Sequence, residues 1–370
     1  MATDNKNKVL NVPHLRFPEF CGEWRKYKLA EICSFFSGGT PSSSKKEYYD
    51  GNIPFIRSGE LHMDKTELFI TEVGLNNSAA KIVDVGDLLL ALYGATSGDI
   101  AISQIKGAIN QAILCIRTTQ NKKFIESVWK KHVEKLLQTY LQGGQGNLSA
   151  DIVKNISFYF AESNEQIKLA KFITLLDERI AIQNKIIEKQ QSLIKGLAVQ
   201  LTQSGTPNVR LRDCIECHSS TLQENCVPAT GSYPVYGATG LIGYTNNYAY
   251  NGESILIVKD GSGVGSLSYV NDRFSVIGTL NYLTAKEKRS VLYLYYALMA
   301  FNFTPYITGM AIPHIYFKDY GKAKVFCPSI ENQIRIASLL HNIEQKLVAE
   351  QNLIISLNAQ KSYLLRMLFI

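Results

Sequence analysis

Basic and aromatic side chains are interleaved at several places in this chain, and together they could bind a polyanion. Lys45 and Lys46 precede two tyrosines, and Lys286, Lys288 and Arg289 precede a tyrosine-rich run. Lysine and arginine neutralise nucleic-acid phosphates, while polar loop residues can read base edges in a groove. Each cluster taken alone is more often a solvated surface, so the pattern leaves both interpretations open.

Two glycine-rich loops could supply further contacts. Gly261 to Gly265 follows a strand-like apolar run, and Gly94 to Gly98 is its counterpart in the first half of the chain. A tight turn between strands explains such a loop, and so does a loop whose backbone N–H groups and hydroxyls approach DNA. Under the second interpretation, the expected DNA contacts come from these loops, from neighbouring loops and from the basic clusters: Lys45, Lys46, Arg57, Ser58, Tyr93, Thr96, Ser97, Gln145, Asn147, Tyr236, Thr239, Lys259, Ser262 and His314.

Signatures of catalysis are missing from the sequence. It has no adjacent prolines, which the Asn-Pro-Pro-aromatic loop of an amino-methyltransferase requires, and no G-x-x-x-x-G-K-[ST] phosphate-binding motif. The six histidines show neither ligand spacing nor a neighbouring nucleophile motif. Cys214 and Cys217 form one C-x-x-C without the second pair that a zinc site would use. We therefore expect no catalytic residue, metal or cofactor in this chain.

The elements that must position these loops occur twice. The patterns of the first half predict, in order, strands at 53–59, 87–92 and 112–116, a helix at 123–141 and a strand at 156–160. The second half repeats this order with a strand at 252–258, a helix at 292–301 and a loop at 308–314 in the place of the loop at 143–147. Each half is therefore expected to form one α/β domain.

Each half ends in a long amphipathic pattern with heptad spacing, at 166–201 and 333–368. The apolar seam positions are Ile173, Leu176, Ile180, Ile187 and Ile194 in the first pattern and Leu340, Ile343, Leu347, Ile354 and Leu364 in the second. Polar residues also occupy the seams, namely Gln183, Gln190, Glu350 and Lys361, and such residues usually select one partner or register. A single amphipathic pattern of this kind would indicate a helix that covers a hydrophobic core. Two such patterns at the same place in two repeats favour long helices that act as a spacer between domains.

Composition sets broad limits on the class of protein. With 370 residues, 46% of them hydrophobic, the chain can form two ordinary cores and connecting helices. The formal charge of +7 is compatible with a polyanionic partner without proving one. The sequence has no apolar run long enough for a membrane span and no signal-type start, so we expect a cytoplasmic protein without a membrane partner.

These residues resemble the DNA-specificity subunit of type I restriction-modification systems, over nearly the whole chain. The resemblance rests on the duplication, on the order of the motifs, and on the motifs themselves: Leu15 to Phe20 with Trp24, Ile53 to Gly59, Tyr233 to Gly237 with Gly240 to Tyr244, and the Gln-Ile pairs at Gln166 and Gln333 that start the two helices.

The resemblance implies an α+β fold, in which two similar α/β target-recognition domains are joined by two long helices that pair as an antiparallel coiled coil with an internal pseudo-twofold repeat. With the breaker-rich linker at 203–208, we expect the first domain at 1–160, the first helix at 161–204, the second domain at 205–328 and the second helix at 329–370.

The resemblance also implies partners. Each domain would bind one half of a split double-stranded DNA sequence, and because the domains differ strongly in sequence the target should be asymmetric. The helices would dock two copies of the modification (methyltransferase) subunit, and the restriction/translocase subunit would join that assembly. S-adenosylmethionine, ATP and magnesium would then belong to those partners.

Two other classes of protein stay open at this point. A coiled-coil scaffold that binds only proteins would show no salt-sensitive, sequence-selective DNA binding. An enzyme with an unrecognised signature would show turnover when purified alone.

Overall fold

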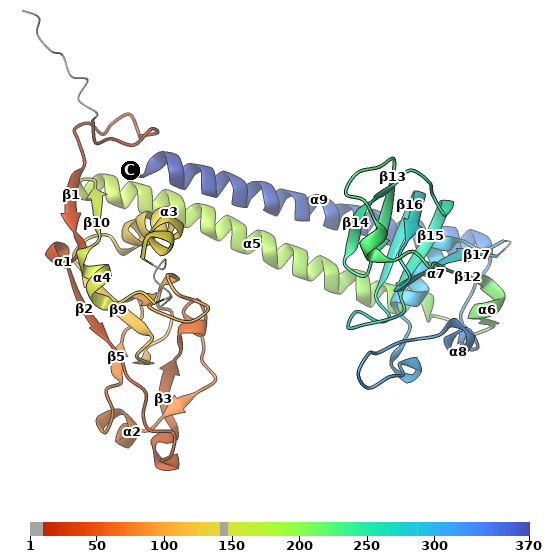
Figure 1. Ribbon diagram of the computed structural model, residues 1–370, viewed down its shortest axis with the longest axis horizontal. Coiled ribbons are helices and arrows are strands. Elements are labelled where there is room, and N and C mark those ends of the chain that lie inside the picture. Colours follow the sequence, from red (N-terminus) through yellow and green to blue (C-terminus); the bar gives the residue numbers. More distant parts are fainter. Residues whose placement is uncertain (1–9, 141–146, 287) are drawn as a thin grey trace, which may run out of the picture. The chain divides into compact units, whose positions relative to one another are not determined.

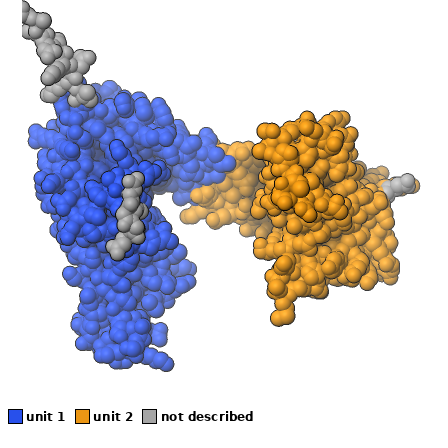
Figure 2. Space-filling view, in the orientation of Figure 1, with its two compact units in different colours: residues 1–182, 354–370 blue, residues 183–353 orange. Residues whose placement is uncertain are grey.

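The computed structural model describes residues 10–140, 147–286 and 288–370 (Figure 1). The chain divides into two compact units, which Figure 2 colours separately: unit 1 is residues 1–182 with 354–370, and unit 2 is residues 183–353. The division crosses both long helices, α5 (Ser163–Thr202) and α9 (Ile330–Leu368), so each unit contains part of each helix.

Unit 1 is built mainly of short strands. Its elements before α5 are β1 (Arg25–Lys28), α1 (Leu29–Ile32), β2 (Cys33–Ser37), η1 (Lys46–Tyr48), β3 (Tyr49–Ile56), η2 (Ser58–Glu60), β4 (Phe69–Ile70), α2 (Glu72–Asn76), β5 (Lys81–Val83), β6 (Leu88–Ala91), β7 (Ile100–Ile102), β8 (Gly107–Ile109), β9 (Ile113–Thr118), α3 (Lys122–Tyr140), α4 (Ala150–Asn155) and β10 (Ser157–Phe160). The strands form sheets of order β2-β9-β6-β7 and β4-β3-β8-β5, and β1 pairs with β10.

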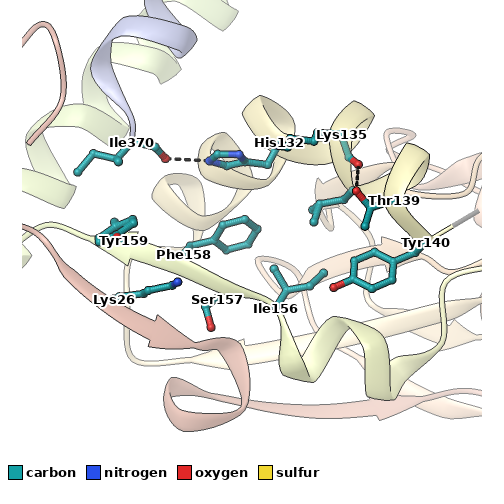
Figure 3. A pocket seen from close by; sticks show the side chains of 11 residues that line it. Lys26, His132, Lys135, Thr139, Tyr140, Ile156, Ser157, Phe158, Tyr159 and Ile370 are labelled. Atoms are coloured by element: carbon teal, nitrogen blue, oxygen red, sulfur yellow. Dashed lines mark hydrogen bonds between the residues drawn. The ribbon is translucent and has the colours of Figure 1, made fainter. Parts of the chain in front are cut away.

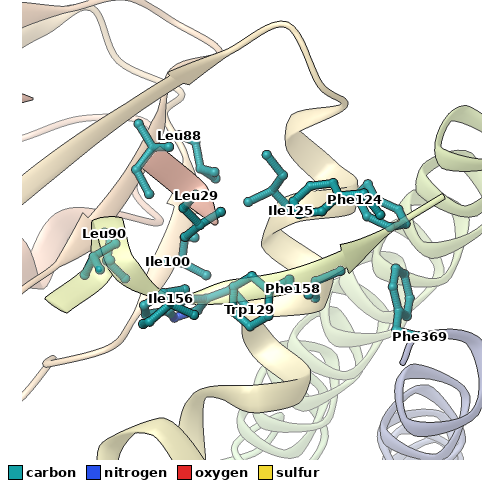
Figure 4. Close-up of a cluster of buried hydrophobic side chains, with 14 of the residues drawn as sticks. Leu29, Leu88, Leu90, Ile100, Phe124, Ile125, Trp129, Ile156, Phe158 and Phe369 are labelled. Carbon is teal, nitrogen blue, oxygen red and sulfur yellow. The ribbon is translucent and has the colours of Figure 1, made fainter. Parts of the chain in front are cut away.

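The main core of unit 1 lies between helix α3, strand β10 and the long helices (Figure 4). The first half of α3 is apolar on several sides and buries Phe124 and Trp129 completely. Phe369, which follows α9, packs against Phe124 with ring centroids 5.3 Å apart. Burying aromatic side chains of this size contributes about 1.5–3 kcal/mol each. The end of α9 is therefore part of the hydrophobic core of unit 1.

Unit 2 contains one larger sheet of order β12-β17-β15-β16-β13-β14 and the pair β11-β18. Its elements between α5 and α9 are β11 (Val209–Arg210), α6 (Leu211–Cys214), β12 (Ile215–Ser219), η3 (Glu224–Cys226), β13 (Tyr233–Gly237), β14 (Gly240–Thr245), β15 (Tyr250–Val258), β16 (Leu267–Val276), β17 (Leu280–Ala285), α7 (Val291–Met299), η4 (Thr304–Tyr306), α8 (Phe317–Tyr320) and β18 (Lys324–Val325). Helix α7 buries Tyr293 and Tyr296 completely in the core below this sheet.

The strand pairings of the two units correspond, and those of β5 with β8, β6 with β7 and β6 with β9 do so at a constant offset of 167 residues. The pair Val83↔Gly107 of β5 and β8 matches Tyr250↔Phe274 of β15 and β16, and the pair Leu88↔Ile102 of β6 and β7 matches Ile255↔Tyr269. The long strands β15 and β16 of unit 2 thus correspond to β5 with β6 and to β7 with β8. In unit 1 the corresponding strands are interrupted after Val83 and after Ile102. These interruptions explain why unit 1 has two four-stranded sheets where unit 2 has one larger sheet.

Buried glutamines attach the start of each long helix to its own domain. Gln166 donates from Nε2 to the carbonyl of Ala161, and Gln333 donates to the carbonyl of Pro328, both at 2.8 Å. Their Oε1 atoms accept from the backbone N–H groups of Asn121 and Ser290, at 3.2 and 3.1 Å. The repeated Gln-Ile motif is therefore explained by a repeated junction between domain and helix.

Within each unit the two long helices pair in an antiparallel direction. In unit 1 the start of α5 meets the end of α9: Ile173 shares a core with Leu368, and Asp177 bonds to Lys361. In unit 2 the end of α5 meets the start of α9, where Ala198 shares a core with Leu340. The predicted antiparallel coiled coil and the α+β fold class are confirmed.

The two polar seam residues Gln183 and Glu350 bond to each other. Gln183, only 7% exposed, donates from Nε2 to the carboxylate and to the backbone carbonyl of Glu350. These residues are 167 positions apart, so they are equivalent residues of the two repeats. The contact therefore joins equivalent positions of α5 and α9, as expected where two copies of one helix run antiparallel.

Most predicted elements are found within two or three residues of the expected limits. The strand expected at 87–92 is β6, the helix expected at 123–141 is α3, which ends at Tyr140 in the part of the chain that the structure describes, and the helix expected at 292–301 is α7. The predicted strand at 53–59 ends earlier, at Ile56, because Arg57 caps the short helix η2. The expected domain limits stay predictions, since the compact units cut through both helices.

The Gln183–Glu350 contact gives a prediction for stability. Glu350→Leu removes the carboxylate acceptor of the buried Gln183 amide and leaves only the long bond to the backbone carbonyl, so the free energy of unfolding should fall by about 1–3 kcal/mol. The double variant Gln183→Leu with Glu350→Leu should recover most of that loss, because both polar groups are gone and two leucines pack in the seam. Urea denaturation followed by circular dichroism measures both, with Asn184→Leu at an exposed neighbour as the control. Additive losses in the double variant would contradict the proposed pairing.

Candidate nucleic-acid interface

In unit 1 a glycine loop lies beside a second loop from elsewhere in the sequence. Gly94 and Gly98 have positive φ angles of 83° and 85°, which L side chains rarely adopt. The N–H of Gly98 donates to Ala91 at 2.9 Å, which closes the turn, and the N–H of Leu148 donates to Leu92 at 2.7 Å. Three predicted contacts, Tyr93, Thr96 and Ser97, are thereby placed close to a fourth, the exposed Asn147.

Unit 2 repeats this arrangement. Gly261 and Gly265 have φ angles of 97° and 84°, and the N–H of Gly265 donates to Val258 at 2.8 Å. The N–H of Ile315 donates to the carbonyl of Lys259 at 2.9 Å, which is the equivalent, 167 positions on, of the bond from Leu148 to Leu92. The predicted contacts Lys259, Ser262 and His314 therefore come together, the last two from loops far apart in sequence.

The turn at the β13–β14 connection joins the same edge of unit 2. Tyr236, Ala238 and Gly240 line a hollow of about 120 Å³ together with Val258 and Ser266, which flank the glycine loop. Thr239 is exposed at the tip of this turn. All five unit 2 candidates thus lie around one edge of the sheet, close to the C-terminal end of β15.

The loops satisfy both interpretations drawn from the sequence. Their glycines are required by backbone geometry, as a tight turn demands, and Ser262 and Thr239 remain exposed as a DNA contact demands. Burial raises the pKa of the Tyr236 hydroxyl, and burial also raises that of Tyr93 despite a hydrogen bond with Gln111. Both phenols therefore stay protonated at neutral pH and can donate a hydrogen bond.

The basic candidates differ in how much of their charge is available. Lys46 is exposed, whereas the ammonium of Lys45 bonds to the Tyr48 hydroxyl at 2.9 Å, and this contact raises the pKa of Lys45. Lys259 forms an ion pair with the adjacent Asp260. Gln145 lies outside the described residues.

Arg57 forms a structural ion pair that the sequence did not indicate. Its Nη2 lies 2.9 Å from Oε1 of Glu60 and 3.2 Å from Oε2 of Glu67, and Glu60 is 6% exposed. Burial alone raises the pKa of Glu60, but hydrogen bonds from the side chain and backbone of Arg57, from the Glu67 backbone and from Thr66 outweigh it and lower the pKa to about 2. The guanidinium therefore holds the loop around the half-buried Ser58, which makes it a poor candidate for a free base contact.

The predicted apolar seam residues of the two partner-docking helices are shielded from solvent. All ten are buried or half-buried: Ile173, Leu176, Ile180, Ile187, Ile194, Leu340, Ile343, Leu347, Ile354 and Leu364. They hold the helices to each other, so a docked partner would contact other faces. Heptad spacing did not indicate the exposed apolar residues on those faces. Their signal in the sequence is a pair of apolar residues outside the seam at an offset of 167, as in Ile167 with Ile334 and Ile186 with Leu353.

Unit 1 also has a hollow of about 410 Å³ beside α3 and β10 (Figure 3). Lys26, His132 and Lys135 are among its lining residues. His132 Nε2 lies 2.8 Å from the carbonyl oxygen of Ile370, and burial lowers the pKa of His132. These contacts attach the residues after α9 to unit 1.

The described ranges contain neither a metal-type cluster nor a membrane-spanning helix. There, no group of three or more His, Cys, Asp or Glu residues is arranged to hold a metal ion. Cys214 faces Cys327, with the sulfur atoms 3.8 Å apart. None of the helices in these ranges is long and apolar enough to cross a membrane.

Comparison with known proteins assigns the family. The model of the type I restriction modification DNA specificity domain matches residues 22–190 and again residues 205–359, so the chain belongs to this family and contains its domain twice. It recognises DNA for a type I restriction-modification system.

Similar proteins cover nearly the whole chain. The type I restriction enzyme MjaIX specificity subunit of Methanocaldococcus jannaschii is 21% identical over 93% of this chain and 92% of its own length. The type I restriction enzyme EcoprrI specificity subunit of Escherichia coli is 22% identical over 87% of each chain. The crystal structure of the type I restriction-modification S subunit from M. genitalium shares the fold, with 17% identity and a TM-score of 0.65 over 97% of this chain and 99% of that chain.

The Arg57–Glu60 contact predicts acid sensitivity in unit 1. The folded-state pKa of Glu60, about 2, is below the ordinary value of 4.5, so its stabilisation is fully present above pH 4.5 and is lost as the pH falls toward 2. The loss amounts to about 3 kcal/mol over this range. Denaturation curves across this pH range should show a weaker pH dependence for Glu60→Gln than for the wild type. Glu67→Gln, at an exposed position, is the control, and equal pH dependence in wild type and Glu60→Gln would refute the assignment.

Proposed function

We propose that this chain is the non-catalytic recognition subunit of a type I restriction-modification complex and binds an asymmetric, bipartite DNA target. Each unit reads one half of that target, and the paired helices hold two copies of a methyltransferase subunit. The restriction/translocase subunit joins this assembly. Methyl transfer with S-adenosylmethionine and translocation with ATP and magnesium belong to those partners.

The observation that carries the DNA part of the proposal is the repeated loop arrangement. In both units a glycine turn and a distant loop meet through equivalent backbone hydrogen bonds, at Leu92 with Leu148 and at Lys259 with Ile315. Backbone geometry is the same in the two copies, but the side chains differ: Tyr93 and Thr96 in one, Asp260 and Gly263 in the other. A shared scaffold with different side chains supports two half-sites of different sequence.

The partner part rests on matched exposed residues of the two helices. Ile167 and Ile334 are each 54% exposed, and Ile186 and Leu353 are 37% and 38% exposed. The two residues of each pair are 167 positions apart, so equivalent positions of the two helices both carry an exposed apolar side chain. Two copies of one subunit need two equivalent docking surfaces, and exposed apolar residues commonly mark such surfaces.

The rival function is a protein scaffold without DNA specificity. A DNA-binding assay distinguishes the two functions. In this assay the chain, purified with its methyltransferase, is mixed with genomic DNA fragments. If the proposal is correct, binding is sequence-selective. The logarithm of the binding constant should also fall linearly with the logarithm of salt concentration, because Lys and Arg contacts to phosphates release counterions from the DNA. Binding that shows no sequence preference at any salt concentration supports the scaffold instead.

Docking has a test of its own. Glu substituted at both Ile186 and Leu353 puts a charge in each proposed surface, and affinity for the methyltransferase subunit should fall at least about tenfold. The matched control is Gln191→Glu with Asn358→Glu, which adds the same charges at another exposed pair separated by 167 positions. Size-exclusion chromatography with light scattering reports the assembly, and circular dichroism reports the fold. Unchanged assembly in the first variant would exclude these residues from the docking surfaces.

A further inference from the structure

The loop between α7 and α8 of unit 2, which can be followed in Figure 1, carries two exposed apolar side chains at its tip. Met310 is fully exposed, and Ile312 is 66% exposed. Placing such side chains in water forgoes the favourable free energy of their burial. Adjacent exposed apolar residues on one loop therefore call for an explanation through a binding partner.

The tip is held in a fixed conformation. Thr308 and His314 exchange backbone hydrogen bonds of 2.9 and 2.8 Å at the base of the loop. Gly309 has a φ of 90°, and a Cβ at this position would lie 2.3 Å from the carbonyl oxygen of Ile312. Because the base is closed and the turn needs this glycine, Met310 is presented on a preorganised turn.

The base of the loop is bonded to the candidate DNA contacts. The N–H of Gly261 donates to the carbonyl of Pro313 at 2.8 Å, and His314 pairs with Asp260 through an isolated β-bridge. Lys259 and Ser262 are therefore neighbours of the loop base. The tip belongs to the edge of unit 2 at which we propose DNA to bind.

Charge and size both favour DNA over a protein as the partner of the tip. The sequence has no acidic residue between Glu287 and Asp319, and the one acid at the loop base, Asp260, is paired with Lys259. Two side chains are too few for a stable protein interface, which typically uses about 20–30 residues on each side. A single apolar contact to the C5-methyl group of thymine is, in contrast, a common element of base readout in the major groove.

We propose that Met310 and Ile312 form a base-reading tip that contacts the C5-methyl group of a thymine in the half-site bound by unit 2. This inference rests on the proposed function and adds the base feature and the side chains that recognise it. The rigid turn positions the apolar contact, while Lys259 and the hydroxyl of Ser262 face the polar surroundings of the same groove.

The test uses the chain in complex with its methyltransferase and a target first identified by sequencing methylated bases. Uracil replaces thymine at one position of the half-site at a time, which removes only the methyl group. For the wild type, one substitution should weaken binding about fourfold, the value of one buried methyl-sized group. For Met310→Ala with Ile312→Ala that penalty should disappear, and binding of the thymine target should be weaker. Met63→Ala, a 51% exposed methionine of unit 1, is the control and should keep the penalty.

Three results would overturn the inference. In the first, replacing thymine by uracil weakens binding of the variant as much as binding of the wild type at every position. In the second, neither half-site contains an A·T pair. The variant could also lose affinity for the methyltransferase while its base preferences stay unchanged, which would make the tip a protein contact. Failure of the proposed function is distinguishable from all three, since the wild-type complex would then show no sequence-selective binding.

Discussion

The bond between Gln183 and Glu350 is the contact on which the organisation of this chain depends. It joins equivalent residues of two repeats inside an otherwise largely apolar seam, and its donor is almost completely buried. A polar pair in such a seam is satisfied in one register only, because sliding either helix by one turn leaves the amide or the carboxylate without a partner. The register of the helices in turn determines which residues of α5 and α9 are exposed, and thus where a partner can dock.

The same constraint explains how one chain can serve two half-sites. Buried glutamines attach each helix start to its domain, and the aromatic residue after α9 packs into the core of unit 1. Each domain is thus anchored to the helix pair by buried contacts and not by its loops. The loops are free to differ in sequence, as they do at the equivalent positions Tyr93 and Asp260, without cost to the scaffold.

Periodicity was sufficient to predict the duplication, the long helices and the order of the main strands and helices. It predicted the seam positions as well, because heptad spacing reports which side chains face a partner helix. Periodicity alone could not show which helix covers each seam, and the structure shows that Ile173 and Leu340 are buried in cores of this chain. Nor could periodicity show that Arg57 is bound to Glu60, since that contact depends on a bend after β3 that side-chain patterns do not encode. Exposure is likewise invisible in a sequence, which is why the tip at Met310 emerged only from the structure.

Measuring the gap between half-sites tests the central claim most directly. One heptad inserted after Gln183 and one before Glu350 keeps their bond and the seam intact and lengthens the paired helices by about 10 Å, or about three base pairs of DNA. Sequencing of methylated bases in cells that carry this variant should find both half-sites unchanged and the gap between them about three base pairs longer. Methylation at the original gap would contradict the account, because the helices would then not set the spacing of the target.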